Sequence, residues 1–324
     1  MRAIILLASY IVSTLGYTQQ SAERPRVLTV SSSKTLTVPP FGFYGEPVCD
    51  ANGNVFVHID TSAYDHIELF ELSHSGDSGV FFKLPSELAE KHHFSDFTVS
   101  PSGKAYVLSE TFEGLYVLDF KSDGSLGSET LLEGTQYLTG GRLAVFDSGA
   151  ILISGYFGER APTNLKGKNF GAIFEGSGAL RTRITEDLGK TNLDETSTKL
   201  LDGAVTVGED GNAYMLHKNE IIIFSETGRI ARHIPIKKAD ERAVGERLNV
   251  SGGVLAVGFV VPEKNHDMSR QYLLLNSVTG EPYGFYTASP DLGTQVLCFS
   301  REEGFTFLGR DEAHRLLKLT AAIR

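Results

Sequence analysis

Six copies of one short pattern recur along this chain of 324 residues. Each copy has a turn that contains glycine, a run of β-branched or aromatic residues, a loop, a second apolar run and another glycine turn. In chain order the first halves read ANGNVFVHI from Ala51, PSGKAYVL from Pro101, DSGAILIS from Asp147, EDGNAYML from Glu209, SGGVLAVG from Ser251 and EEGFTFLG from Glu302. A repeat of this kind predicts an array of small β-sheets.

The spacing of the turn glycines identifies the unit. They are Gly53, Gly103, Gly149, Gly211, Gly253 and Gly304, and successive ones are 50, 46, 62, 42 and 51 residues apart. Tight hairpins need a positive φ, which glycine adopts at little cost. The spacing is that of a four-stranded blade, so we expect an all-β six-bladed β-propeller with antiparallel blades.

The two ends of the array predict how the ring closes. The segment HRLLKLTAAIR from His314 supplies only a third strand for the last blade. The segment RVLTVSSSKTLTVP, residues 26–39, is extended and β-branched but precedes the first blade. We expect it to complete the sixth blade, because closure removes edge strands that would otherwise be exposed. Residues 26–324 then form a single domain.

The first residues differ from the rest of the chain. Arg2 precedes an apolar stretch, residues 3–12, and small residues follow it. This order predicts a secretory signal peptide over residues 1–17 and a polar linker over residues 18–25, with a disordered apolar terminus as the alternative. The protein is accordingly expected to be secreted or periplasmic. No apolar run approaches the ~20 residues of a membrane span.

Charge narrows the classes of partner. The chain has 40 acidic and 30 basic residues, a formal net charge of −10, and no cluster of Lys or Arg longer than a pair. Nucleic acid is therefore not an expected partner, because phosphate binding needs concentrated positive charge. We expect a monomer that binds a protein or a small molecule.

The two cysteines precede the first turns of blades one and six, which become neighbours in a closed ring. A disulfide between Cys49 and Cys298 would join these blades, and an oxidising compartment would permit it. The interpretation favoured from the sequence is two buried thiols, since their Cα separation could exceed the ~7 Å that a bridge allows.

Loop lengths predict the functional face. In an antiparallel blade, the loops between the second and third strands emerge beside the links between blades, and the long segments of this chain all occupy those two positions. Loops on a rigid scaffold commonly carry binding, although each side chain there could simply be solvated. The candidate ligand-binding residues are His92, His93, Arg160, Lys168, Asn169, His266 and Asp267.

Acidic residues recur where each blade begins. Glu46, Asp96 and Glu246 each lie seven residues before a turn glycine, and Asp202 lies nine before. Four carboxylates around one mouth of the channel would repel one another unless a cation or a basic group lay among them. They are candidate ligands for calcium or another divalent cation. The alternative is that they point sideways, bond to neighbouring backbone or face water.

One stretch resembles known families. The phrase DGAVTVGEDGNAYMLHKNEIIIFSETGRIARHIPI, residues 202–236, resembles a blade of the NHL-repeat and gluconolactonase-like propellers, the latter also called senescence-marker-type lactonases. That resemblance implies a channel metal held by a Glu, an Asn and an Asp. Asp202 before Gly203 fits the last ligand, and Glu46 in GEPVC fits the first approximately. Where Asn-Gly is expected, the chain has Gly140 and Gly141.

These observations predict a β-propeller that binds a ligand or a protein through its long-loop face and requires no catalysis. The alternative is a metal-dependent hydrolase of the lactonase or esterase type, with a divalent cation among Glu46, Asp96 and Asp202. A structural module in a larger assembly is a third possibility.

Overall fold

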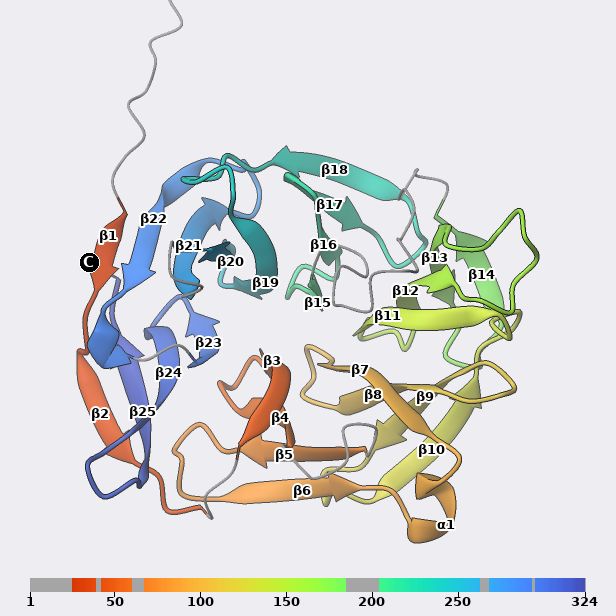
Figure 1. Ribbon diagram of the computed structural model, residues 1–324, viewed down its shortest axis with the longest axis horizontal. Coiled ribbons are helices and arrows are strands. Elements are labelled where there is room, and N and C mark those ends of the chain that lie inside the picture. Colours follow the sequence, from red (N-terminus) through yellow and green to blue (C-terminus); the bar gives the residue numbers. More distant parts are fainter. Residues whose placement is uncertain are drawn as a thin grey trace, which may run out of the picture.

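The fold is a closed ring of six small sheets. The computed structural model describes residues 25–38, 42–59, 67–184, 204–262, 268–292 and 295–323. Each sheet is a blade that radiates from a common axis (Figure 1). The six-bladed β-propeller predicted from the repeat is confirmed. The predicted signal peptide lies outside the described residues.

The strands follow one another along the chain from the axis outward. Blade one contains β3 (Phe43–Cys49), β4 (Val55–Ile59), β5 (Glu68–Leu72) and β6 (Gly79–Lys83). Blade two contains β7 (His93–Val99), β8 (Ala105–Glu110), β9 (Leu115–Phe120) and β10 (Leu126–Leu131). Blade three contains β11 (Leu138–Val145), β12 (Ile151–Phe157), β13 (Asn169–Phe174) and β14 (Leu180–Arg183). The short helix α1 (Ser86–Ala89) links blades one and two.

The second half of the ring repeats this order. Blade four contains β15 (Val205–Val207), β16 (Ala213–His217), β17 (Glu220–Phe224) and β18 (Ile230–Pro235). Blade five contains β19 (Val244–Ser251), β20 (Val254–Pro262), β21 (Met268–Asn276) and β22 (Pro282–Ala288). Blade six contains β23 (Gln295–Ser300), β24 (Gly304–Arg310) and β25 (Leu316–Ala321), and the 3-10 helix η1 (Pro290–Leu292) precedes it.

The turn glycines have the backbone conformation that the repeat predicts. The φ angles of Gly103 and Gly149 are 85° and 84°, in the region where a Cβ atom is unfavourable. All six have positive φ: Gly53, Gly103, Gly149, Gly211, Gly253 and Gly304. Each glycine therefore fixes the hairpin between the first two strands of its blade.

The hydrophobic core lies between blades and not within them. One cluster packs Phe56 and Phe82 of blade one against Phe97 and Phe120 of blade two. Similar clusters fill the other five boundaries, including the boundary between blades six and one. Each blade buries both of its faces, so no blade can be stable without its neighbours.

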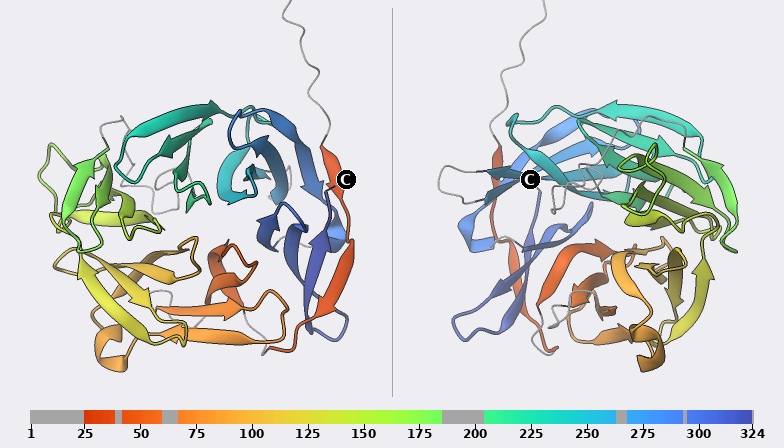
Figure 2. Two further views of the ribbon diagram at one scale, coloured as in Figure 1. Left: turned by 180° about the vertical axis from the view of Figure 1, so that it is seen from behind. Right: turned by 45° about the vertical axis from the view of Figure 1, so that its right-hand side comes forward.

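The N-terminal segment closes the ring along its outer edge. The strand β2 (Ser32–Thr35) pairs antiparallel with β25 and completes blade six, as predicted. The strand β1 (Arg26–Leu28) pairs in parallel with β22 and gives blade five a fifth strand, which the sequence did not predict. Both views in Figure 2 show this segment along the outside of blades five and six.

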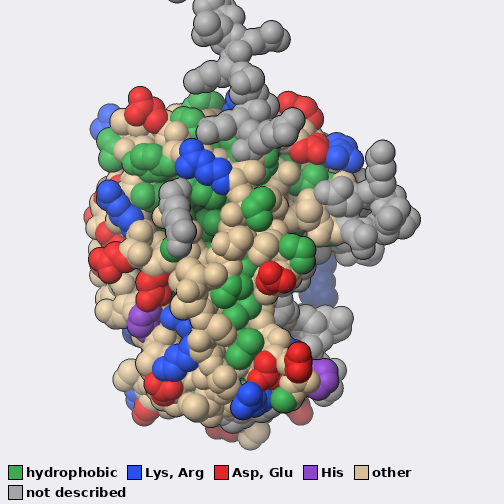
Figure 3. All heavy atoms as spheres, turned by 90° about the vertical axis from the view of Figure 1, so that its left-hand side faces the viewer, with side chains coloured by type: hydrophobic (Ala, Val, Ile, Leu, Met, Phe, Trp, Pro, Cys, Tyr) green, Lys and Arg blue, Asp and Glu red, His purple; other side chains and the backbone are tan. Residues whose placement is uncertain are grey.

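The outer surface that β1 and β2 cover is mixed in character. Acidic, basic and apolar side chains are interspersed across this face (Figure 3). Among the described residues, helices are too short and polar to cross a bilayer.

A disulfide joins the innermost strands of blades one and six. Cys49 on β3 and Cys298 on β23 are bonded, and their Cα atoms are 5.9 Å apart. The sequence-based preference for two thiols is therefore wrong. Closure of the ring sets β23 beside β3, which brings the Cα atoms within the range for a bridge. The bond spans 249 residues and connects the ends of the ring.

Replacement of Cys49 and Cys298 by serine is expected to lower the free energy of unfolding by about 2–4 kcal/mol, because the bond restricts the unfolded chain over a long loop. Urea denaturation followed by circular dichroism measures this difference. The wild type in dithiothreitol should then unfold as the double variant does. Equal stability of the oxidised wild type and the variant would contradict the prediction.

Candidate functional site

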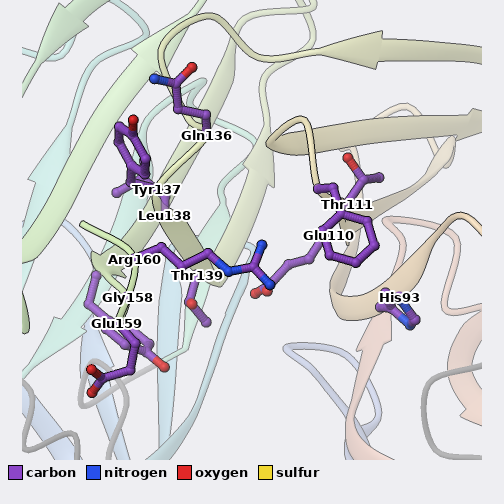
Figure 4. Close-up of a pocket in the computed structure, with 12 residues that line it drawn as sticks. His93, Glu110, Thr111, Gln136, Tyr137, Leu138, Thr139, Gly158, Glu159 and Arg160 are labelled. Atoms are coloured by element: carbon purple, nitrogen blue, oxygen red, sulfur yellow. The ribbon is translucent and has the colours of Figure 1, made fainter.

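A pocket opens on the long-loop face between blades two and three. Its volume is about 490 Å³. Its walls are the loop after β8, the link that leads into β11 and the loop after β12 (Figure 4). Of these three walls, only the loop after β12 is one of the long loops from which the sequence predicts binding. We call this cavity the loop pocket, and it is lined by His93, Glu110, Phe112, Tyr137 and Arg160 among others.

Arg160 provides the positive charge of the loop pocket. Its guanidinium carbon lies 5.2 Å from the centroid of the Phe112 ring, a cation–π contact. Its side chain extends across the pocket toward Glu110 (Figure 4). Phe112 is 83% exposed and Tyr137 is 43% exposed, so two aromatic rings are open to a ligand beside this charge.

Glu110 provides the acidic group. One of its carboxylate oxygens accepts a hydrogen bond of 2.7 Å from the backbone N–H of Gly140. Burial raises the pKa of Glu110, although this hydrogen bond and His93 lower it. At the rim, Glu159 forms an ion pair of 3.1 Å with Lys166. The pocket therefore offers hydrogen-bond donors and acceptors, with Arg160 as its anion-binding group.

The other predicted ligand-binding residues do not gather there. His92 is buried inside blade two, where its ring nitrogens lie 2.9 Å from the Ser109 hydroxyl and 2.9 Å from the Glu129 carboxylate. It cannot contact a ligand on the loop face from this position. Lys168 and Asn169 are described but lie outside the pocket lining. His266 and Asp267 lie outside the described residues.

The channel mouth is shaped by irregularities in the innermost strands. The pairing register shifts between Phe94 and Asp96 in β7, and between Gly140 and Arg142 in β11. Comparable shifts occur in β3, β19 and β23. A bulge bends its strand and redirects nearby side chains. Three residues of the predicted ring, Glu46, Asp96 and Glu246, lie at or next to these bulges.

The structure brings two of the predicted carboxylates together around an arginine. The guanidinium of Arg142 lies 3.8 Å from a carboxylate oxygen of Glu46 and 3.7 Å from one of Asp96. The other oxygen of Asp96 accepts a hydrogen bond of 2.8 Å from the backbone N–H of Leu143. We call Glu46, Asp96 and Arg142 the channel cluster. They line a cavity of only about 40 Å³, which is large enough for water but too small for an organic ligand.

Burial dominates the acid–base behaviour of the channel cluster. It raises the pKa of Glu46 to about 7, although the charges of Arg142 and Arg247 lower it. It also raises the pKa of Asp96 against the opposing effect of Arg142. Burial alone would lower the pKa of Arg142, but Asp96 and Glu46 outweigh it and the net shift is upward. Arg142 therefore stays charged.

Of the two remaining candidate metal ligands, only Glu246 is described, and it does not complete a site. Glu246 forms an ion pair of 3.5 Å with Arg270 of its own blade. Asp202 lies outside the described residues. Within the described ranges, no three His, Cys, Asp or Glu side chains are grouped to hold a metal ion. The donor set around Glu46 does not fit a divalent cation, since a guanidinium already lies within 4 Å of both carboxylates.

Sequence reasoning missed Arg142, although the signal was present. Arg142 lies seven residues before Gly149, the same offset that identified Glu46 and Asp96, but only acidic residues were sought there. The glycine in place of the expected Asn also has a reason. A Cβ atom on Gly140 would lie 2.7 Å from the Leu108 side chain of blade two.

Phe112 and Glu110 were missed for a different reason. Phe112 lies in the loop after β8, and Glu110 is the last residue of β8. That loop is short, whereas the sequence predicts binding from the long loops. Their signal was the exposed aromatic residue in the phrase ETFEG, residues 110–114.

Comparisons with known proteins support the fold. The chain matches no protein-family model, and no curated protein sequence matches it. Among solved structures, it resembles a calcium-binding protein, regucalcin, from Agrobacterium tumefaciens, with 15% identity and a TM-score of 0.52 over 92% of this chain and 97% of that one. A proposed gluconolactonase shares 14% identity, with a TM-score of 0.52 over 90% of this chain and 93% of that one.

A proposed exported protein from Bacteroides fragilis is also similar, with 12% identity and a TM-score of 0.54 over 92% of this chain and 95% of that one. The resemblance to gluconolactonase-like propellers is thus confirmed at the level of the fold.

The raised pKa of Glu46 predicts that the free energy of unfolding depends on pH between about pH 5 and 7. The folded protein holds a proton that the unfolded chain releases above about pH 4.5, so the free energy of unfolding should fall as pH rises from about 5 to 7. The glutamine in Glu46→Gln has no titratable group, so this variant is expected to lose less free energy of unfolding over that pH range, by roughly 3 kcal/mol at most. Urea denaturation at several pH values measures it. Glu159→Gln, at the exposed rim of the loop pocket, is the control, and equal pH slopes for both variants would contradict the prediction.

Proposed function

We propose that this protein is a ligand-binding β-propeller that holds a small polar organic molecule in the loop pocket. The observation that carries the proposal is the pocket itself. Its volume of about 490 Å³ falls within the ~300–1,000 Å³ that is usual for small-molecule sites. The channel cavity of about 40 Å³ is too small for such a ligand.

The side chains of the pocket favour a ligand with an acidic group. Arg160 can bind a carboxylate through two parallel hydrogen bonds. Phe112 and Tyr137 present exposed ring surface to the apolar part of the same molecule. Burial raises the pKa of Glu110, so its repulsion of an anion is weaker than that of a solvated carboxylate.

The alternative function is a metal-dependent hydrolase of the lactonase type. It requires a divalent cation that carboxylates hold in the channel. The ion pairs of Arg142 with Glu46 and Asp96 argue against it, because the carboxylates that such a cation needs are already paired with a guanidinium. A catalytic role is therefore not part of the proposal.

Replacement of Arg160 by methionine is expected to weaken ligand binding at least ~10-fold, through loss of the charged hydrogen bonds. A panel of small carboxylic acids and sugar acids can be screened by thermal shift, and the affinity of any hit measured by calorimetry. Lys168→Met is the matched control, since Lys168 lies on the same loop but outside the pocket lining. Equal affinity of both variants for the hit, or no hit in the panel, would contradict the proposal.

We also propose that the chain is exported through its N-terminal segment, residues 1–17. Support comes from the order of a basic residue, an apolar stretch and small residues there. After expression of the full sequence in a bacterium, mass spectrometry of the periplasmic or secreted fraction should detect a chain that begins between residues 17 and 20. Recovery of the uncleaved chain from the cytoplasm alone would contradict this prediction.

A further inference from the structure

One sequence position recurs in or next to the innermost strand of each blade. The position lies seven residues before the turn glycine, and its occupants in chain order are Glu46, Asp96, Arg142, Ala204, Glu246 and Leu297. Three of them are acidic and one is basic. Arg142 is the occupant contributed by blade three, so a cation of the chain itself enters the ring of carboxylates.

Arg142 makes its contacts across blade boundaries. One terminal nitrogen faces Asp96 of the adjacent blade two at 3.7 Å, and the other faces Glu46 of the more distant blade one at 3.8 Å. The three side chains are mostly buried, with 28% of Arg142, 19% of Glu46 and 16% of Asp96 exposed. Water screens such a buried group of charges less than it screens a surface ion pair.

The strand that carries Arg142 also fixes one of its partners. The backbone N–H of Leu143, the next residue, donates to Asp96 at 2.8 Å. At the other end of the bulge, Gly140 also contacts blade two, and its carbonyl accepts a hydrogen bond of 2.9 Å from the Ser95 hydroxyl. The bulge in β11 is thus held at both ends, and the position of Arg142 is set by backbone contacts.

A divalent cation would compete with this arrangement for the same oxygens. Calcium binds carboxylate oxygens at about 2.3–2.6 Å, and a bound ion would have to share Glu46 and Asp96 with a guanidinium less than 4 Å from each. The repulsion between the ion and the guanidinium in a partly buried site opposes binding. Glu246 is paired with Arg270, so its carboxylate cannot readily replace Glu46 or Asp96 as a metal ligand.

From this geometry we infer that Arg142 is an internal cation of the channel: it pairs with both Glu46 and Asp96, excludes divalent metal ions from them and ties blade three to blades one and two. The inference is independent of the loop pocket.

The test is to remove the guanidinium and ask whether the carboxylates acquire a metal ion. Arg142→Met keeps a similar length of side chain but removes the guanidinium that lies within 4 Å of both Glu46 and Asp96. Melting temperatures of the full chain are measured in chelator and in millimolar CaCl₂ or MnCl₂. The wild type should show no shift. Arg142→Met should melt lower in chelator and regain about 3–5 °C with metal.

Arg181→Met is the matched control. Arg181 belongs to the same blade and forms a bidentate ion pair with Glu175 on the outer surface, at 2.7 Å for each hydrogen bond. The Arg181→Met variant also removes the arginine partner of a carboxylate, that of Glu175, but Glu175 is not part of the channel cluster. We therefore expect no melting-temperature response of this variant to metal.

If Arg142→Met does not fold in either condition, metal titrations of the wild type and of Asp96→Asn decide the question by calorimetry. Absence of stoichiometric calcium or manganese binding by the wild type supports the inference. Stoichiometric binding that Asp96→Asn abolishes would overturn it. A metal response of Arg142→Met no larger than that of Arg181→Met would also overturn it.

Discussion

The pairing of β2 with β25 closes the ring, and the rest of the structure depends on that closure. Every hydrophobic cluster lies between two blades, including the one that joins blade six to blade one. An open array would expose one such surface at each end and leave two unpaired edges. Closure also sets β3 beside β23, where the disulfide forms, and brings the occupants of the channel mouth close enough to interact.

Charge at the axis and open volume at the rim lead to different roles for the two regions. At the axis, the carboxylates of Glu46 and Asp96 meet the guanidinium of Arg142 in a cavity of about 40 Å³. At the rim, Arg160 lies beside an exposed ring in a pocket of about 490 Å³. Arg142 therefore acts within the scaffold, whereas Arg160 is available to a ligand.

Features set by local backbone chemistry could be predicted from the sequence. The turn glycines, the number of blades and the closing strand follow from residue preferences over short distances. Features set by the ring radius could not be predicted from the sequence. The Cα separation of Cys49 and Cys298 is such a feature. Arg142 was predictable from its offset, but its two partners depend on how three blades meet. The loop pocket combines a short loop that carries Phe112 with a long loop that carries Arg160, and loop length alone could not reveal that pairing.

The most direct test of this account is the electron density of the channel in crystals soaked with manganese, whose anomalous scattering identifies a bound ion. The account predicts density for the Arg142 guanidinium between Glu46 and Asp96, with no anomalous peak within coordination distance of either carboxylate. An anomalous peak bound to those carboxylates, with Arg142 turned away from them, would contradict it and restore a metal-dependent function to the channel.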